Sequence, residues 1–258
     1  MLDRKIKVSV VSYTNSLPFV YGLENYTGDK NFELEKDIPS LCANKLVNDK
    51  VDVGLVPVAV IPELKEHYII SDYCIGADGE VGSVLLLSDV PLNEIKMVLL
   101  DFHSRTSIQL VQVLSRSFWK ISPIWKKTSE NFISQISGTT AAVVIGDRTF
   151  ALKGKYNYAY DLAEEWKKFT SLPFVFAAWV ANKKLPESFL SSFSKAIQFG
   201  IENKQAVIHQ LNQKQIEGFD AEVYLNQHIR FDLNEEKKQG LALFLNYLKE
   251  AENALTIE

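Results

Sequence analysis

The chain has 258 residues, of which 47% are hydrophobic and 23% are charged, proportions typical of a globular protein with one large or two small domains. The 28 Lys and Arg residues against 32 Asp and Glu residues give a formal net charge of −4. This balance, without a cluster of basic residues, predicts no nucleic-acid partner. No apolar stretch reaches the roughly 18 residues that span a bilayer, which predicts no membrane segment.

Short apolar runs alternate with helical patterns through the first part of the chain. The runs are IKVSVV (6–11), LPFVYGLE (17–24), VDVGLVPV (51–58) and SVLLL (83–87). A second series repeats the order of strand, polar loop and helix, with KMVLLD (96–101), a helical face of Ile108, Val111 and Leu114, and TAAVVIGD (140–147). Strands that alternate with helices predict an α/β fold with a mainly parallel sheet.

The last third of the chain has helical spacing. Phe189, Phe193, Ile197 and Ile201 recur every four residues after Pro186, a residue suited to a first helical turn. A final helix is predicted from Leu241, Phe244, Leu245 and Leu248.

Two long apolar runs divide the chain into two candidate lobes. SVLLLSD (83–89) and LPFVFAAWVANKK (172–184) have the character of strands that cross between lobes, and no Gly/Ser-rich linker separates the two series. The predicted division is 1–87 plus 179–258 for lobe one and 88–178 for lobe two. Phe174, Phe176 and Trp179 either pack in the core or line a closed cleft between the lobes.

Three polar loops lie where a predicted strand gives way to a helix: SYTNS (12–16), DFHSRTS (101–107) and GDRT (146–149). The first amide N–H groups of a helix lack intrahelical partners, so such loops bind carboxylates readily. Simple helix capping is the alternative for each loop. Ser104, Thr106 and Ser107 exceed the single cap that one helix needs, whereas Arg105 is equally compatible with a solvated surface position.

Metal and cofactor chemistry has no support in the sequence. Cys42 and Cys74 belong to no ligand spacing, which predicts buried reduced thiols and neither a disulfide nor a zinc site. The histidines show no metal spacing, and the usual motifs of serine hydrolases, zinc peptidases and nucleotide-binding enzymes are missing. We therefore expect no cofactor and no metal. The amino terminus shows no signal-peptide pattern, which predicts a cytoplasmic protein.

The loops and their flanking strands resemble the chorismate dehydratase family of the futalosine route to menaquinone. The resemblance is carried by VSYTNSLPFVYGLE (11–24), DVGLVPVA (52–59), SVLLLS (83–88), LDFHSRTSIQLVQVL (100–114), VVIGDRTF (143–150) and YDLAEEWKKFTSLPFVFAAW (160–179). It implies a two-lobed α/β fold like that of the type II periplasmic binding proteins, with a ligand cleft between the lobes. It also implies a hydro-lyase that converts chorismate to 3-[(1-carboxyvinyl)oxy]benzoate and water without a cofactor.

Because chorismate carries two carboxylates, the resemblance implies that the polar loops bind them. We expect Ser104, Arg105, Thr106 and Ser107, with backbone N–H groups, to bind one carboxylate. Tyr13, Asn15 and Ser16 would contact the ring, its hydroxyl or the other carboxylate, with Ser83 in the wall of the cleft. Asn15, Ser83 and Asp147 are the catalytic candidates. The general base stays open between Asp147, His103 and the substrate's own enolpyruvyl carboxylate.

Other functions remain compatible with this fold. A non-catalytic solute-binding protein for a small carboxylate would normally carry an export signal, and a regulator would carry a helix-turn-helix segment. The related dihydroxynaphthoate synthase of the same pathway carries a Ser-Pro-Cys-Pro-Asn-Asp type loop where this chain has SYTNSLP (12–18). The chain departs from the family at Thr14, more often Leu, and at Ser171, more often Gly.

Overall fold

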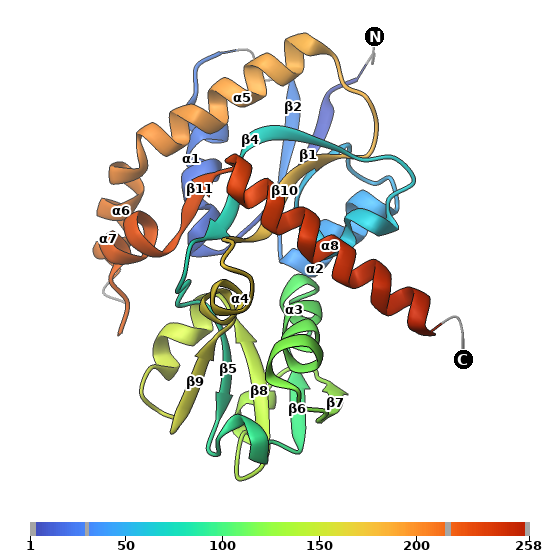
Figure 1. The fold of residues 1–258 in the computed structure, drawn as a ribbon. Helices are drawn as coiled ribbons and strands as arrows, with labels where there is room; N and C mark the ends of the chain where they lie inside the picture. The colour runs from blue at the N-terminus through green and yellow to red at the C-terminus, as the bar shows by residue number, and fades with distance from the viewer. Residues whose placement is uncertain (1–3, 29–30, 215–217, 256–258) are drawn as a thin grey trace.

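Two mixed β-sheets with helices around them build the protein, and a computed structural model describes residues 4–28, 31–214 and 218–255 (Figure 1). The first sheet has the strand order β11 (Arg230–Asp232), β4 (Tyr68–Ala77), β10 (Phe174–Ala181), β3 (Val53–Pro57), β1 (Ile6–Val11) and β2 (Phe32–Asp37). The second has the order β7 (Ile124–Lys127), β6 (Met97–Leu100), β8 (Thr140–Ile145), β5 (Val84–Ser88) and β9 (Tyr158–Asp161).

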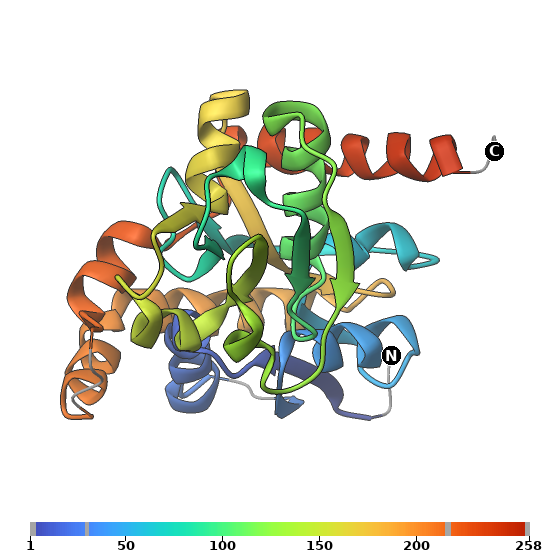
Figure 2. The same cartoon turned by 90° about the horizontal axis from the view of Figure 1, so that it is seen from below.

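Helices pack against both sheets. The α-helices are α1 (Leu17–Asn25), α2 (Pro39–Val47), α3 (Thr106–Leu114), α4 (Leu162–Thr170), α5 (Glu187–Glu202), α6 (Lys204–Asn212), α7 (Ala221–Val223) and α8 (Glu235–Leu255). Short 3-10 helices are η1 (Thr14–Ser16), η2 (Val58–Glu63), η3 (Leu92–Glu94), η5 (Phe132–Gln135) and η6 (Gly146–Leu152), and π-helical turns are η4 (Ser115–Trp119) and η7 (Tyr224–His228). Figure 2 shows the last part of α8 extending away from both sheets.

The prediction of mainly parallel sheets is wrong. β1 pairs in parallel with β2 and β3, and β6 with β7 and β8. β10 runs antiparallel to both β3 and β4, and β5 runs antiparallel to both β8 and β9. Strands that join a sheet after the chain has crossed from the other lobe enter it in the opposite direction, and a continuous apolar run does not encode that direction.

The predicted lobe boundaries fall inside two strands. β5 belongs wholly to the second sheet and β10 wholly to the first. The chain therefore changes sheet between Ala77 and Val84, and again between Asp161 and Phe174. We accordingly propose moving the boundaries of 87/88 and 178/179 to these two crossing segments.

The core is continuous through both lobes. Most of β1, β3 and β10 is buried, as are Phe189, Phe193 and Ile197 on the predicted face of α5. Cys42 and Cys74 are buried free thiols, as expected. In the described ranges no helix is both long and apolar enough to cross a membrane.

α4 shows how local sequence fixes an element at the second crossing. Asp161 caps its amino end by accepting the N–H groups of Ala163 and Glu164. The Asp161 carboxylate also accepts the N–H of Gly82, at 2.7 Å. Asp161 therefore connects the two crossing segments. The helix ends at Ser171, whose φ of 63° lies in the left-handed region that favours glycine.

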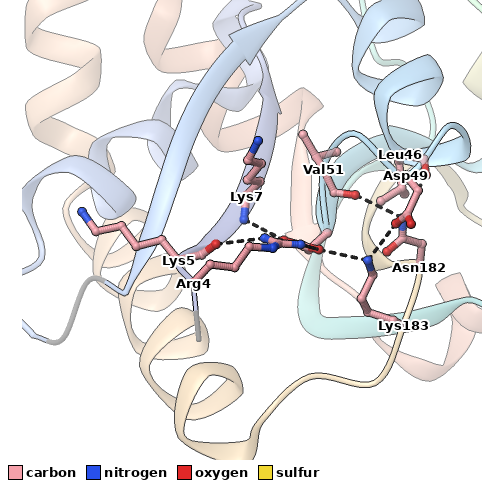
Figure 3. A network of polar contacts seen from close by, with 9 residues as sticks. Arg4, Lys5, Lys7, Leu46, Asp49, Val51, Asn182 and Lys183 are labelled. Carbon is pink, nitrogen blue, oxygen red and sulfur yellow. Dashed lines mark hydrogen bonds and ion pairs between the residues drawn. The ribbon is translucent and has the colours of Figure 1, made fainter. Parts of the chain in front are cut away.

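A charged network closes the amino ends of β1 and β3 (Figure 3). The carboxylate of Asp52, 1% exposed, accepts two bonds from the Arg4 guanidinium, at 2.6 and 2.7 Å, and one from the backbone N–H of Lys7. Lys183, at the end of β10, lies 3.1 Å from Asp52 and 2.7 Å from Asp49. Burial alone would raise the pKa of Asp52, but these partners hold it at about 2.

Candidate functional site

A small cavity of about 60 Å³ lies between the two sheets. It sits at the carboxyl ends of β1, β3, β6 and β8, the edge where ligands of open α/β sheets bind. Its polar lining comes from both lobes and consists of Tyr13, Asn15, Ser16, Ser83, Ser104, Thr106 and Ser107. The predicted loops 12–16 and 101–107 therefore meet at one place, and Gly146 of the third loop joins them.

The first loop is held by its own backbone. η1 places Ser16 so that its N–H and its hydroxyl both bond the carbonyl of Tyr13, at 2.9 and 3.2 Å. The Ser16 hydroxyl also lies 3.2 Å from the Asn15 side-chain oxygen. This bond leaves the amide N–H₂ of Asn15 available for other acceptors.

The Tyr13 ring packs against the third loop at Gly146. Gly146 has a φ of +71°, and a Cβ there would lie 2.9 Å from the Tyr13 ring. Both the backbone angle and the close approach require glycine at this position. The helix expected to follow GDRT is the 3-10 helix η6, which already includes these four residues.

The second loop opens α3 toward the cavity. The hydroxyl of Ser104 accepts the N–H of Ser107 at 3.0 Å and so satisfies one free donor in the first turn of this helix, whose N-cap position is Arg105. The hydroxyl proton of Ser104 remains available to the cavity. Thr106 is used differently: its hydroxyl donates to the carbonyl of Phe176 and accepts the N–H of Ala59, both in lobe one. The Thr106 side chain thus connects the two lobes, and only its backbone N–H remains free to bind a ligand.

Ser83 stands at the first crossing segment. Its carbonyl accepts the N–H of Gly146 at 2.9 Å, and its hydroxyl accepts a bond from the Tyr224 hydroxyl at 2.8 Å. The Asn15 side chain hydrogen-bonds the same Tyr224 hydroxyl. Sequence reasoning missed Tyr224, because no local pattern in YLNQHIRF indicates that a tyrosine 141 residues away meets Ser83.

Asp147 and His103 lie behind the cavity wall. The carboxylate of Asp147 accepts the backbone N–H of Thr14 at 3.2 and 3.3 Å. Burial raises the pKa of Asp147, against the bonds from Thr14. Nδ1 of His103 lies 2.6 Å from the Tyr13 hydroxyl. Burial and the charge of Arg148 lower the pKa of His103, so the neutral ring accepts this bond.

Arg105 points away from the cavity. Its guanidinium binds Glu63 at 2.8 and 2.9 Å and the side-chain oxygen of Asn44 at 2.5 Å. Arg105 was predicted to bind a substrate carboxylate. In the structure it forms an ion pair with Glu63, a carboxylate of lobe one. Of the three candidate aromatic residues, Phe176 lines the cavity, whereas Phe174 and Trp179 pack edge-on against other core rings.

The cavity offers hydrogen-bond donors without formal charge. Within the described part of the chain, no Asp, Glu, His, Lys or Arg side chain lines it. Burial raises the pKa of Tyr13 to about 12, so its phenol stays neutral. Among the described residues no group of three His, Cys, Asp or Glu side chains is placed to hold a metal ion. The arrangement suits a small anionic molecule held by hydroxyl, amide and helix N-terminal donors.

A larger hollow of about 320 Å³ lies on the other side of Tyr224. It is lined by η6, β9 and the α7–η7 region, and it contains Glu80, Asp161, Glu164 and Asp220. Four carboxylates against one lysine, Lys153, disfavour an anionic ligand there. The smaller cavity is therefore the better candidate site.

Comparison with known proteins identifies the family of the chain and supports its fold. Residues 6–250 match the family model for menaquinone biosynthesis. The chain is 27% identical over 249 residues to a chorismate dehydratase from Campylobacter jejuni, with 93% of this chain and 96% of the relative covered.

Solved structures with similar folds include AF1704 from Archaeoglobus fulgidus, at a TM-score of 0.77 and 13% identity, with 98% of this chain and 99% of that chain covered. The periplasmic aliphatic sulphonate-binding protein SsuA from Escherichia coli has a TM-score of 0.59 and 14% identity, with 98% and 93% covered. The fold is therefore the two-lobed α/β fold of periplasmic binding proteins, and the chain belongs to the menaquinone biosynthesis family.

Proposed function

We propose that the protein is a chorismate dehydratase, a hydro-lyase that converts chorismate to 3-[(1-carboxyvinyl)oxy]benzoate and water on the futalosine route to menaquinone. The observation that carries this proposal is the interlobe cavity, where neutral donors from two lobes face each other. A molecule with carboxylates at both ends is complementary to such a cavity. The similarity to the Campylobacter jejuni chorismate dehydratase supports the same substrate.

One carboxylate of chorismate binds at the amino end of α3. The backbone N–H groups of this helix and the hydroxyl of Ser104 supply its donors. Asn15 and Ser83, on the opposite side, contact the ring hydroxyl or the other carboxylate. Tyr13 and Phe176 provide the ring surfaces that hold the substrate between the lobes.

The reaction breaks one C–H and one C–O bond of the ring. Removal of the C3 proton places negative charge on the ring carboxylate through the C1–C2 double bond. The C4 hydroxyl then leaves, combines with a proton as water, and the ring becomes aromatic. Fixed donors aimed at the developing charge lower this barrier, and loss of one such donor typically costs about 3 kcal/mol.

The substrate's own enolpyruvyl carboxylate is the base that fits the cavity best. Asp147 is held by the N–H of Thr14, and His103 by the hydroxyl of Tyr13. Neither lines the cavity, whose described lining has no carboxylate or imidazole. The protein's part is then to orient the substrate carboxylate toward C3 and to exclude water.

Mixing purified protein with chorismate tests the proposal. We expect the cyclohexadiene absorbance to be replaced by that of a benzoate, with the product identified by mass spectrometry. Binding of chorismate without conversion would support a non-catalytic solute-binding protein instead. Alanine at Asp147 and at His103 then tests the base: turnover that survives both changes nearly intact supports the substrate carboxylate.

A further inference from the structure

Tyr224 lies directly behind the polar wall of the cavity. It is 3% exposed and belongs to η7, on the lobe-one side of the molecule. Its hydroxyl reaches Ser83 at 2.8 Å and is hydrogen-bonded by Asn15. Tyr224 does not line the cavity itself, whereas both of its partners do.

The ring of Tyr224 is fixed by its neighbours. It packs edge-on against Phe150, with ring centroids 5.0 Å apart, and against Phe219, at 5.6 Å. Asp220 caps the short helix before η7 by accepting the N–H of Val223 at 3.0 Å. The hydroxyl is therefore presented at one defined position, with little freedom of the ring.

The crossing segment that carries Ser83 is also fixed, and it lies against η7. Gly82 has a φ of +71°, and a Cβ there would lie 2.8 Å from Nδ1 of His228. Its carbonyl accepts the Thr149 hydroxyl at 3.1 Å, and its N–H binds Asp161. Ser83 and Tyr224 are thus held in register by contacts independent of their own bond.

The direction of the hydrogen bonds at Tyr224 decides which donors face the cavity. The Tyr224 hydroxyl has one proton, which it donates to Ser83, so it accepts from the amide of Asn15. Ser83 accepts at its oxygen and keeps its own proton for the cavity. A chain of donors then runs from Asn15 through Tyr224 to Ser83, and each bond polarises the next.

We propose that Tyr224 is a positioning residue that fixes the rotamers and hydrogen-bond direction of Asn15 and Ser83, so that both present donors to the substrate. This inference rests on the proposed function. Tyr224 touches no substrate atom and acts only through its two partners. Because charge develops on the substrate during the reaction, well-aligned donors matter more to the transition state than to the bound substrate.

Tyr224→Phe tests the inference, since it removes the hydroxyl and keeps the ring between Phe150 and Phe219. We expect kcat for chorismate to fall about 10- to 100-fold, as for the loss of one or two hydrogen bonds, with KM changed less than about threefold. The matched control is Tyr247→Phe, on α8, whose ring packs on Trp166 and Phe169 away from the cavity. It should retain wild-type kcat.

A double-mutant cycle shows whether Tyr224 acts through Ser83. With Ser83→Ala in place, Tyr224→Phe should lower kcat by a smaller factor than it does in the wild type, because one of its two partners is already missing. Effects that simply multiply would overturn the inference. A wild-type kcat in Tyr224→Phe alone would overturn it as well, while leaving the proposed function intact.

Binding of isophthalate, an aromatic dicarboxylate, separates failure of the inference from failure of the proposed function. If the wild-type protein binds isophthalate but leaves chorismate unchanged, the proposed function fails, and calorimetry tests the positioning role. Tyr224→Phe should then weaken isophthalate binding about two- to threefold, in line with its small effect on KM, because the misaligned donors still face a bound carboxylate. Unchanged binding would contradict the inference, and a wild-type protein that neither binds isophthalate nor converts chorismate would contradict both.

Discussion

The two ends of β1 and β3 carry buried polar groups of opposite character. At the amino ends, the Asp52 carboxylate binds the charged side chains of Arg4 and Lys183 and the backbone N–H of Lys7 (Figure 3). At the carboxyl ends, the cavity is lined by hydroxyls and amides with no charged side chain among the described residues. The same two strands thus have a network that stabilises the fold at one end. At the other end they have a site whose donors are free to bind a ligand.

This difference shows when a buried polar residue indicates function. A carboxylate that receives four bonds from the protein has nothing left to offer a substrate. Ser83 and Ser104 each accept a bond from the protein and retain a proton that faces the cavity. The two ends should therefore respond oppositely to mutation, one in stability and the other in activity.

Asn15→Ala should produce the largest effect. We expect kcat/KM for chorismate to fall about 100- to 1,000-fold, the cost of removing one donor aimed at developing charge, with a melting temperature near that of the wild type. Asn25→Ala, on the exposed end of α1, is the control and should leave kcat/KM unchanged. Activity of Asn15→Ala within threefold of the wild type would remove Asn15 from the site.

Asp52→Asn should show the opposite pattern. Removing the charge leaves Arg4 and Lys183 without their buried partner and should lower the free energy of unfolding by about 3 kcal/mol in denaturant titrations. Asp78→Asn is the control: its pair with Lys167 is about 40% exposed on both sides and should be worth less than about 1 kcal/mol. A similar loss in both variants would contradict the importance of the network.

Acid should weaken the amino-end network. The pKa of Asp52 is about 2 in the fold against an ordinary value of 3.8, so its contribution is fully present above pH 4 and is lost as pH falls toward 2. The loss is roughly 2 kcal/mol of unfolding free energy for a shift of this size. Asp52→Asn should flatten this part of the curve, and a wild-type slope in the variant would assign the acid sensitivity elsewhere.

Tyr13→Phe removes a hydrogen bond between the lobes. Its loss of about 1 kcal/mol should raise KM for chorismate about fivefold while kcat changes less. In the wild type this bond needs neutral His103, whose pKa is lowered by burial and by Arg148. The hydrogen bond therefore contributes fully above about pH 6.5, the ordinary pKa of histidine. Its contribution is lost as the pH falls through the lowered pKa of His103. If KM depends on pH in the same way in the wild type and in Tyr13→Phe, the hydrogen bond between Tyr13 and His103 does not contribute to binding.

Ser171→Gly should produce the smallest effect, and it should stabilise. Relief of the left-handed conformation at the end of α4 should add about 0.5–1 kcal/mol to the free energy of unfolding. Ser191→Gly, on an exposed turn inside α5, should instead cost about 0.5 kcal/mol. Destabilisation of Ser171→Gly would show that the serine side chain makes a contact worth more than the backbone relief.

Much of the fold was predictable, because it depends on local patterns. The apolar runs at 6–11, 83–87 and 140–147 and the spacing of four through α5 correspond to observed elements. The direction of β5 and β10 was not predictable, since a strand buried on both faces has the same composition in either direction. That direction depends on which lobe the chain has just left.

The candidate site was predictable where it lies at the ends of strands. The loops at 12–16 and 101–107 follow β1 and β6, and strand topology brings them to one cavity. Arg105 was misplaced because its nearest carboxylate, Glu63, belongs to the other lobe. Tyr224 was missed because its partner Ser83 lies 141 residues away in the sequence, and the two meet only in the folded protein.

A crystal structure with 3-[(1-carboxyvinyl)oxy]benzoate bound tests the central claim most directly. We expect the aromatic ring between Tyr13 and Phe176, one carboxylate at Ser104 and the amino end of α3, and the other end of the ligand at Asn15 and Ser83. A ligand bound in the hollow beyond Tyr224, or held by a charged side chain, would contradict that claim.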